Sequence, residues 1–170
     1  MWYVLWVMTG REENIINAIH NKVPDELYSK AWIPTRVKIA KFHGEEQQSL
    51  IRLFPGYVFV DTEVPEKIHM ILKGEKNCIG FLRQEGEFSP VSEEEKKTIS
   101  YFTDNKGIAG ISLGKVIDGR THIIDGPLKG LDDKIVRVDR HKKKAWVFLP
   151  NFLGKDREIP FALEMIETDV

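Results

Sequence analysis

The residues Phe54-Pro55-Gly56-Tyr57-Val58-Phe59-Val60 decide the fold of the chain. Their aromatic and β-branched side chains favour a strand, which extends back to Leu50. Upstream, residues 27 to 41 alternate between apolar and polar side chains, and a polar loop follows at residues 43 to 49. The two stretches and the loop between them predict a long β-hairpin.

On the N-terminal side, a strand and a helix are predicted. The segment Trp2 to Met8 is aromatic and β-branched without helical spacing, which indicates a buried strand. Thr9 and Glu12 then have the spacing of a capping box, which satisfies backbone amides at the start of a helix. The predicted helix ends at Pro24 and carries one apolar stripe. The stripe consists of Ile15, Ile16 and Ile19.

Two further helices are predicted on the C-terminal side of the hairpin. Pro65 suits the first turn of a helix that runs to Leu72, and Ser92 precedes three glutamates whose charge favours a helix N-terminus. Between these helices, residues 78 to 83 and 87 to 90 form a strand pair. The first hundred residues therefore predict an α+β domain, in which an antiparallel sheet carries helices on one face.

After the third predicted helix the sequence changes character. Residues 103 to 110 contain glycine and polar residues without periodicity, which indicates an interdomain linker. From Ser112 onward, short β-rich runs alternate with turn signals. We therefore predict a first domain at residues 1–103, a linker at 104–111 and a small all-β barrel at 112–170.

Composition limits the class of protein. The chain has 170 residues, of which 42% are apolar, and a formal net charge of -1. It can bury one ordinary core or two small ones, and any contact with nucleic acid must come from a local patch. Cys78 is the only cysteine, so no internal disulfide forms and a reduced, cytoplasmic compartment is expected. No apolar run is long enough to cross a bilayer, so we expect no membrane contact.

Enzymatic function is not expected, and we predict no catalytic residue, cofactor or metal. The histidines are scattered, no His/Asp/Glu grouping has metal-ligand spacing, and Cys78 has no nucleophile signature around it. The glycine-rich residues 126 to 130 lack the lysine and hydroxyl pair of a phosphate-binding loop. The chain is expected to act by binding, as a monomer.

Two sets of motifs resemble the NusG family of transcription elongation factors. Trp2-Tyr3-Val4, Ile33-Pro34-Thr35 and the stretch Phe54 to Val60 resemble its N-terminal (NGN) domain. Asp125-Gly126-Pro127-Leu128-Lys129-Gly130 resembles the loop of its KOW domain, an SH3-like barrel. Asn151-Phe152-Leu153-Gly154-Lys155 is similar to the turn where the family usually has Phe-Gly-Arg. Order and spacing fit the family over nearly the whole chain.

Within the family, three segments are similar to the LoaP branch of specialised paralogues. They are Thr9 to Glu13, Gly126 to Leu131 and Asp139 to Lys142. This resemblance implies a processive antiterminator of long operons, whose KOW domain recognises an RNA hairpin in the leader transcript. Leu153-Gly154-Lys155 departs from the common Phe-Gly-Arg order, because Phe152 is displaced by one residue.

The resemblance also implies contacts with RNA polymerase. Trp2, Phe54 and Tyr57 match family positions that form a pocket for the clamp helices of the largest polymerase subunit. His69 and Met70 fall where one specialised relative contacts the opposite side of the polymerase cleft. The predicted polymerase-binding residues are Trp2, Phe54, Pro55, Tyr57, Phe81, His69 and Met70. The alternative is that the aromatic residues are core, as strand aromatics often are.

Positive charge is concentrated near one turn of the predicted barrel. Residues 137 to 144 contain five Lys or Arg and one His against a single acid, Asp139. Such a cluster suits the phosphates of a folded RNA, and Trp146 and Phe152 can stack on unpaired bases. The predicted RNA-binding residues are Lys129, Arg137, Arg140, His141, Lys142, Lys143, Lys144, Lys155 and Arg157. The alternative is a solvated turn that is simply rich in charge.

Three functions are compatible with these residues. The first is a specialised antiterminator that is recruited by a leader RNA hairpin. The second is a general NusG elongation factor whose KOW domain binds proteins, such as a ribosomal protein or the Rho termination factor. The third is a ribosome-associated RNA-binding KOW protein, which has no need of the Phe54-Pro55-Gly56-Tyr57 motif. The basic turn favours the first function.

Overall fold

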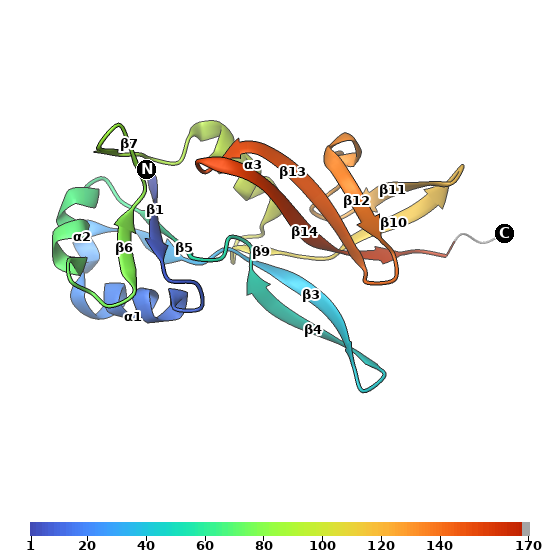
Figure 1. The fold of residues 1–170 in the computed structure, drawn as a ribbon, viewed down its shortest axis with the longest axis horizontal. Coiled ribbons are helices and arrows are strands. Elements are labelled where there is room, and N and C mark those ends of the chain that lie inside the picture. The colour runs from blue at the N-terminus through green and yellow to red at the C-terminus, as the bar shows by residue number, and fades with distance from the viewer. Residues whose placement is uncertain (168–170) are drawn as a thin grey trace. The chain divides into compact units, whose positions relative to one another are not determined.

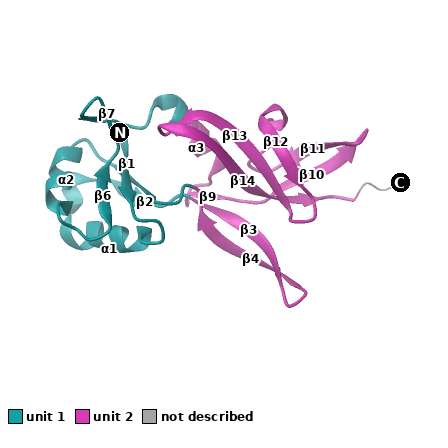
Figure 2. Cartoon of the chain, viewed as in Figure 1, with its two compact units in different colours: residues 1–34, 54–96 teal, residues 35–53, 97–170 magenta. Residues whose placement is uncertain are grey.

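The computed structural model describes residues 1–167, with three α-helices and many strands among them (Figure 1). By packing, the chain divides into two compact units that are not contiguous in sequence (Figure 2). Unit 1 contains Met1–Pro34 and Phe54–Lys96, and unit 2 contains Thr35–Leu53 and the chain from Lys97 onward. A domain is a segment that can fold alone, so the predicted boundaries of 1–103 and 112–170 stay a prediction.

Unit 1 is built on a four-stranded antiparallel sheet in the order β2-β5-β1-β6. Its strands are β1 (Trp2–Val7), β2 (Lys30–Trp32), β5 (Tyr57–Asp61) and β6 (Cys78–Phe81). In the central pair, Val4 lies opposite Phe59 and Trp6 lies opposite Tyr57. The strand predicted at the N-terminus is confirmed, and it pairs with the aromatic stretch from which the fold was predicted.

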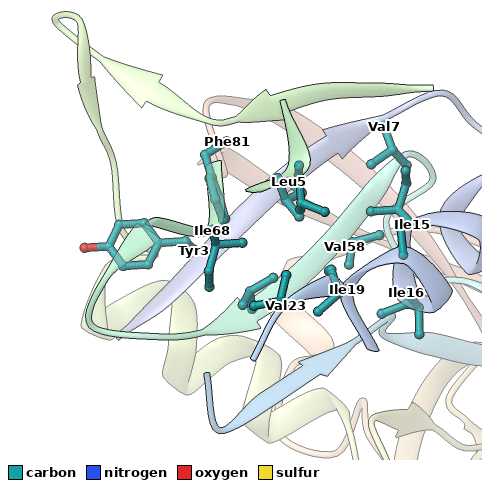
Figure 3. Close-up of a cluster of buried hydrophobic side chains, with 13 residues drawn as sticks. Tyr3, Leu5, Val7, Ile15, Ile16, Ile19, Val23, Val58, Ile68 and Phe81 are labelled. Atoms are coloured by element: carbon teal, nitrogen blue, oxygen red, sulfur yellow. The ribbon is translucent and has the colours of Figure 1, made fainter. Parts of the chain in front are cut away.

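Helices α1 (Glu12–Lys22) and α2 (Pro65–Leu72) pack against one face of this sheet. Side chains alternate along a strand, so Leu5 and Val7 share a face of β1 and pack in one core cluster with Ile15, Ile19 and Ile68 of the helices (Figure 3). Ile19 and Ile68 are 0% exposed. The predicted apolar stripe of the first helix is therefore the side that forms the core.

The third helix, α3 (Glu93–Phe102), begins with a capping box. The Ser92 hydroxyl accepts a hydrogen bond of 3.1 Å from the Glu95 amide, and the Glu95 carboxylate accepts one of 2.9 Å from the Ser92 amide. Both amides lie in the first turn, where the helix offers them no partner. A short hairpin, β7 (Arg83–Gln84) with β8 (Glu87–Phe88), precedes the helix.

Unit 2 contains a five-stranded, SH3-like barrel in the order β11-β10-β14-β13-β12. Its strands are β10 (Ser112–Ile117), β11 (Arg120–Asp125), β12 (Ile135–Asp139), β13 (Lys144–Phe152) and β14 (Lys155–Met165). β10 pairs with β14 in parallel, and the other neighbours are antiparallel. Leu128, Val147, Phe161 and Leu163 are fully buried in its core. The predicted all-β half is confirmed. Two short 3-10 turns occur within residues 1–167, η1 (Asp25–Leu27) and η2 (Asp132–Lys134).

Unit 2 also contains the hairpin of β3 (Thr35–Phe42) and β4 (Glu45–Arg52). β9 (Ile108–Ala109) joins β3 in parallel, and β3 packs beside β14 of the barrel. At the end of α3, the ring centroid of Phe102 lies 4.7 Å from that of Phe161. The hairpin and the last turns of α3 therefore pack with the barrel strands.

The predicted strand bounds of the hairpin and the capping box of the first helix are wrong. The expected strand from Leu50 to Val60 is interrupted at Pro55-Gly56, where Gly56 has a φ of 83°, so β4 pairs with β3 whereas β5 pairs with β1 and β2. The upstream stretch is likewise divided, at Ile33-Pro34, into β2 and β3. The capping box of Thr9 and Glu12 does not form, because the Glu12 carboxylate binds the amides of Gly10 and Gly56 instead.

The predicted linker at residues 103 to 110 contains local structure of its own. The Asp104 carboxylate accepts hydrogen bonds of 2.8 and 3.0 Å from the amides of Lys106 and Ile108. Ile108 and Ala109 then form β9. A strand of two residues is too short to show periodicity, which is why the sequence pattern missed it. No helix within residues 1–167 is long and apolar enough to cross a membrane.

Candidate functional site

The sheet of unit 1 has a second face, which carries an aromatic cluster consisting of Trp2, Trp32, Phe54 and Phe59. The ring centroids of Trp2 and Trp32 lie 4.8 Å apart, and those of Trp32 and Phe59 lie 5.6 Å apart. Phe54 lies 5.9 Å from Phe59. The charged amines of Lys30 and Lys96 sit 4.6 Å and 5.0 Å from the rings of Trp32 and Trp2, which is cation–π distance.

The structure groups part of the predicted polymerase-binding set on this face. Trp2 and Phe54 belong to the aromatic cluster, and Tyr57 lies two residues before Phe59 on β5, so it points to the same side. Phe54 and Tyr57 are only 1% and 8% exposed. In this structure they act as core residues, as the alternative interpretation held, while their role in binding stays a prediction.

The other members of the set lie elsewhere. Phe81 belongs to the core cluster on the helical face, with its ring centroid 5.7 Å from that of Phe88. His69 of α2 is half-buried, with its ring 5.5 Å from the same Phe88. Met70 is 64% exposed, and Pro55 is exposed at the turn before β5. The seven residues therefore do not form one surface.

The sequence reasoning overlooked Trp6, which is 50% exposed. It lies on the face of β1 that carries Trp2, directly opposite Tyr57 of β5. Exposed tryptophans are frequent anchors in protein interfaces. The alternation of Trp2, Val4 and Trp6 along β1 was the signal that could have identified it.

The second candidate site is the turn between β12 and β13. Arg140–Lys143 form this turn as predicted, and Asp139 lies opposite Lys144 at its base. The Asp139 carboxylate accepts a hydrogen bond of 2.8 Å from the Lys142 amide, and Lys143 has a φ of 56°. Asp139, at the base of the turn, thus stabilises the turn backbone through its carboxylate, while the side chains of Arg140 and Lys142 are exposed.

Beside the turn lies an open cleft of about 510 Å³, lined by Arg137, Val138, Asp139, Arg140, Lys142 and Trp146. The guanidinium of Arg137 stacks 3.9 Å from the centre of the Trp146 ring, and Arg140 donates a hydrogen bond of 3.3 Å to the Thr121 hydroxyl. The Glu158 carboxylate lies 3.8 Å from the Arg137 guanidinium. A flat aromatic surface bordered by cations can stack with a base and contact its phosphates.

The remaining predicted RNA-binding residues do not line this cleft. Lys143 pairs with Glu46 of β4 at 2.5 Å. Arg157 donates hydrogen bonds of 2.7 and 3.3 Å to the carbonyl oxygens of Phe152 and Leu153, so it stabilises the turn of residues 151 to 154. Phe152 is 6% exposed and does not offer its ring for stacking. Lys129, His141 and Lys155 are exposed.

Two cations that the sequence reasoning missed lie near Lys144. The pKa of Lys144 is lowered first by burial and then by the charges of Lys38, Arg36 and Lys142, with Asp139 opposing. Burial also lowers the pKa of Arg36, which is 8% exposed. Arg36 and Lys38 are two residues apart on β3 and so share one face. Their alternation in Thr35–Phe42 was visible in the sequence, but the proximity of this strand to the barrel was not.

An antiparallel α+β domain combined with an SH3-like barrel defines a class of fold and not one activity. The family model for the transcription termination factor NusG matches residues 1–100, which is more than half of the chain. The chain belongs to the NusG family. Within residues 1–167, no group of three or more His, Cys, Asp and Glu is placed to hold a metal ion.

Individual relatives match along almost their whole length. The transcription termination/antitermination protein NusG of Pseudomonas aeruginosa is 23% identical over 174 residues, covering 99% of this chain and 97% of the relative. The protein of the same name from Lactococcus lactis is 25% identical over 175 residues, covering 98% and 91%. A solved structure titled domain interaction in Thermotoga maritima NusG has a TM-score of 0.57 at 24% identity, covering 96% of this chain and 92% of the other. This likeness confirms the fold, and the chain is a NusG-type transcription factor.

Proposed function

We propose that the chain is a processive antitermination factor of the LoaP type, which binds RNA polymerase through its first 103 residues and a leader RNA hairpin through its barrel. The RNA-binding part of this proposal rests on the cleft at the β12–β13 turn. There, Arg137 stacks on Trp146, and Arg140 and Lys142 line the cleft. Family membership supports the role in transcription. Residues 104–111 would connect the two domains.

The polymerase-binding surface is proposed to be the sheet face that carries the aromatic cluster. Trp2, Trp6 and Tyr57 lie on this face, and Trp6 already exposes half of its surface. Covering such side chains with a partner contributes about 25 cal/mol for each Å² of apolar surface removed from water. The partner that fits is the pair of clamp helices of the largest polymerase subunit, because helices offer apolar ridges to a groove or sheet face.

The mechanism follows from differential binding. A factor that contacts both sides of the polymerase cleft favours the closed clamp only to the extent that it binds this state better than the open one. Met70 on α2, which is 64% exposed, is available for the second contact. No bond is made or broken by the factor. The closed clamp would resist the opening that accompanies pausing and hairpin-dependent termination.

Polymerase binding is tested with Trp6→Ala in the 170-residue chain. Because Trp6 is half exposed, its removal should cost little folding stability while reducing capture of core RNA polymerase by more than fivefold. Phe42→Ala is the matched control, since Phe42 is a similarly exposed aromatic residue at the end of β3. Equal capture by both variants and the wild type would place the polymerase contact elsewhere.

RNA binding is tested with the leader transcript of the operon adjacent to the gene, against a scrambled transcript of equal length. Arg137→Gln, Arg140→Gln and Lys142→Gln combined should abolish the preference for the leader. Lys67→Gln, Lys73→Gln and Lys76→Gln make the same change in charge on exposed residues of unit 1. Should the wild-type chain not distinguish the two transcripts, a general elongation factor whose barrel binds proteins would be the better interpretation.

A further inference from the structure

Arg36 is a buried cation whose guanidinium nitrogen Nη1 has no hydrogen-bond partner among residues 1–167. It lies on β3, opposite Ile51 of β4 and Ala109 of β9, and only 8% of its surface is exposed. Leaving a buried charge unpaired costs several kcal/mol in general, so natural proteins rarely keep one without a use. A group of this kind points to a ligand that supplies the missing acceptor.

The neighbours of Arg36 are also cationic. Lys38 is the next residue on the same face of β3, and its side chain is half-buried. Lys144 begins β13, where it lies opposite Ala162 of β14, the barrel strand that packs beside β3. The charges of Arg36 and Lys38 both act on the Lys144 amine and lower its pKa, after burial as the first cause.

The nearby acids each contact another residue of the β12–β13 turn. The carboxylates of Glu46 and Glu164 lie 2.5 Å and 3.9 Å from the amine of Lys143, the residue before Lys144. Asp139 raises the pKa of Lys144, but its Oδ1 already accepts from the Lys142 amide. The ion pair of Lys143 with Glu46 joins the hairpin to the barrel turn next to Lys144.

We propose that Arg36, Lys38 and Lys144 form a phosphate-binding site for the backbone of the RNA that occupies the neighbouring cleft. The inference rests on the proposed RNA-binding function and extends it to the β3–β4 hairpin. Lys142 links the two sites, because it lines the cleft and its charge also reaches Lys144. A phosphate oxygen supplies the acceptor that Arg36 lacks, and a guanidinium can bind two such oxygens at once.

We predict that Arg36→Gln in the 170-residue chain has opposite effects on folding stability and on RNA affinity. Without RNA, removal of this buried charge should leave the Tm unchanged or raise it, since Nη1 makes no hydrogen bond to residues 1–167 that could be lost. With the leader transcript, affinity should fall about tenfold, and the slope of log K against log salt should decrease by about 0.7 to 0.9, as for one lost phosphate contact. Arg36→Lys should restore part of the affinity.

Sharing of one phosphate is tested by a double-mutant cycle. Arg36→Gln and Lys144→Gln together should weaken binding little more than either change alone, whereas Arg36→Gln and Lys97→Gln should add independently. Lys97 is an exposed residue of α3 that does not line the cleft. Full additivity for the first pair would overturn the shared site.

The outcomes separate this inference from the proposed function. One outcome is that the wild-type chain and Arg36→Gln bind the leader equally well, whereas the cleft variants do not bind it. The proposed phosphate site would then be wrong, and the cleft would remain the RNA-binding site. If the wild-type chain does not bind the leader, both fail. Inorganic phosphate is the second probe. If phosphate raises the Tm of the wild type but not of Arg36→Gln, and the two bind RNA equally well, the site binds a free anion and the proposed RNA contact is wrong.

Discussion

The carboxylate of Glu12 accepts a hydrogen bond of 2.8 Å from the backbone amide of Gly56, 44 residues further along the chain. Its other oxygen accepts one of 2.9 Å from the amide of Gly10. Glu12 is 0% exposed, so its charge is buried and depends on these two hydrogen bonds. A single side chain at the start of α1 thus fixes the Pro55-Gly56 turn that leads into β5.

Glu12→Ala should therefore destabilise the chain strongly. It leaves two amides without their acceptor, and a hydrogen bond to a charged group contributes about 1.5–3 kcal/mol. We expect a loss of about 3 kcal/mol in the free energy of unfolding, and nearly as much for Glu12→Gln, because its NH2 group would place a donor against one of the two backbone N–H groups. Urea denaturation measures both. The exposed Glu26 gives the control, because Glu26→Ala should change stability by less than about 0.5 kcal/mol.

Gly126 in the turn after β11 should tolerate no side chain. Its φ is 96°, and an added Cβ would lie 2.5 Å from the Cα of Ser112 and 2.7 Å from the carbonyl oxygen of Ile111. Gly119 provides a matched control, because its φ is 76° but nothing lies within 4 Å. Gly119→Ala should cost about 1–2 kcal/mol from backbone strain alone. Gly126→Ala should cost at least about 2 kcal/mol more through overpacking, and equal midpoints in thermal denaturation would contradict this.

Much of the fold could be predicted because the strongest patterns are local. Strand β1, the stripe of α1, the Pro65 start of α2 and the Ser92 cap of α3 follow from neighbouring residues. The role of Glu12 could not be predicted, since its partner Gly56 is distant in sequence. The same holds for β9, which is defined by its pairing with β3 and not by any pattern of its own.

Trp146 should contribute to RNA affinity through stacking. Its ring carries Arg137 on one side at 3.9 Å and lines the cleft. Loss of one stacked base costs about 1–3 kcal/mol, so Trp146→Leu should weaken leader binding by at least about fivefold. Phe148→Leu is the control, because Phe148 is an exposed aromatic two residues along the same strand. Fluorescence anisotropy with labelled leader RNA measures both; equal losses would exclude a specific stacking role.

Of the candidate RNA-binding site, only the residues in and next to the β12–β13 turn could be predicted from the sequence. Arg137 to Lys144 are close in sequence, so their charge was evident, and the turn at Arg140–Lys143 formed as expected. Which of these cations is already paired depends on tertiary contacts: Lys143 pairs with Glu46, which lies 97 residues earlier. Arg36 and Lys38 come from the same distant hairpin. Proximity in sequence therefore predicts the turn, but not the residues of the distant hairpin that lie beside it.

The ion pair of Lys143 with Glu46 should stabilise the chain over a defined pH range. Its hydrogen bond is the first cause that lowers the pKa of Glu46 below 4.5 and raises the pKa of Lys143 above 10.5. A lowered acid pKa contributes stability above its unfolded value and loses it as the pH falls through the folded pKa. A raised lysine pKa contributes below its unfolded value and loses it as the pH rises through the folded pKa.

We therefore expect the stability difference between the wild type and Glu46→Gln to be constant from about pH 6 to about pH 9 and to shrink in acid below the ordinary carboxyl pKa. Both side chains are about one-third exposed, so added salt should reduce the difference as well. Glu45→Gln, at an exposed neighbouring position, should show neither dependence. Thermal denaturation across the pH series measures the effect, and a difference that persists undiminished in acid would mean that Glu46 stabilises the hairpin by packing and not by its charge.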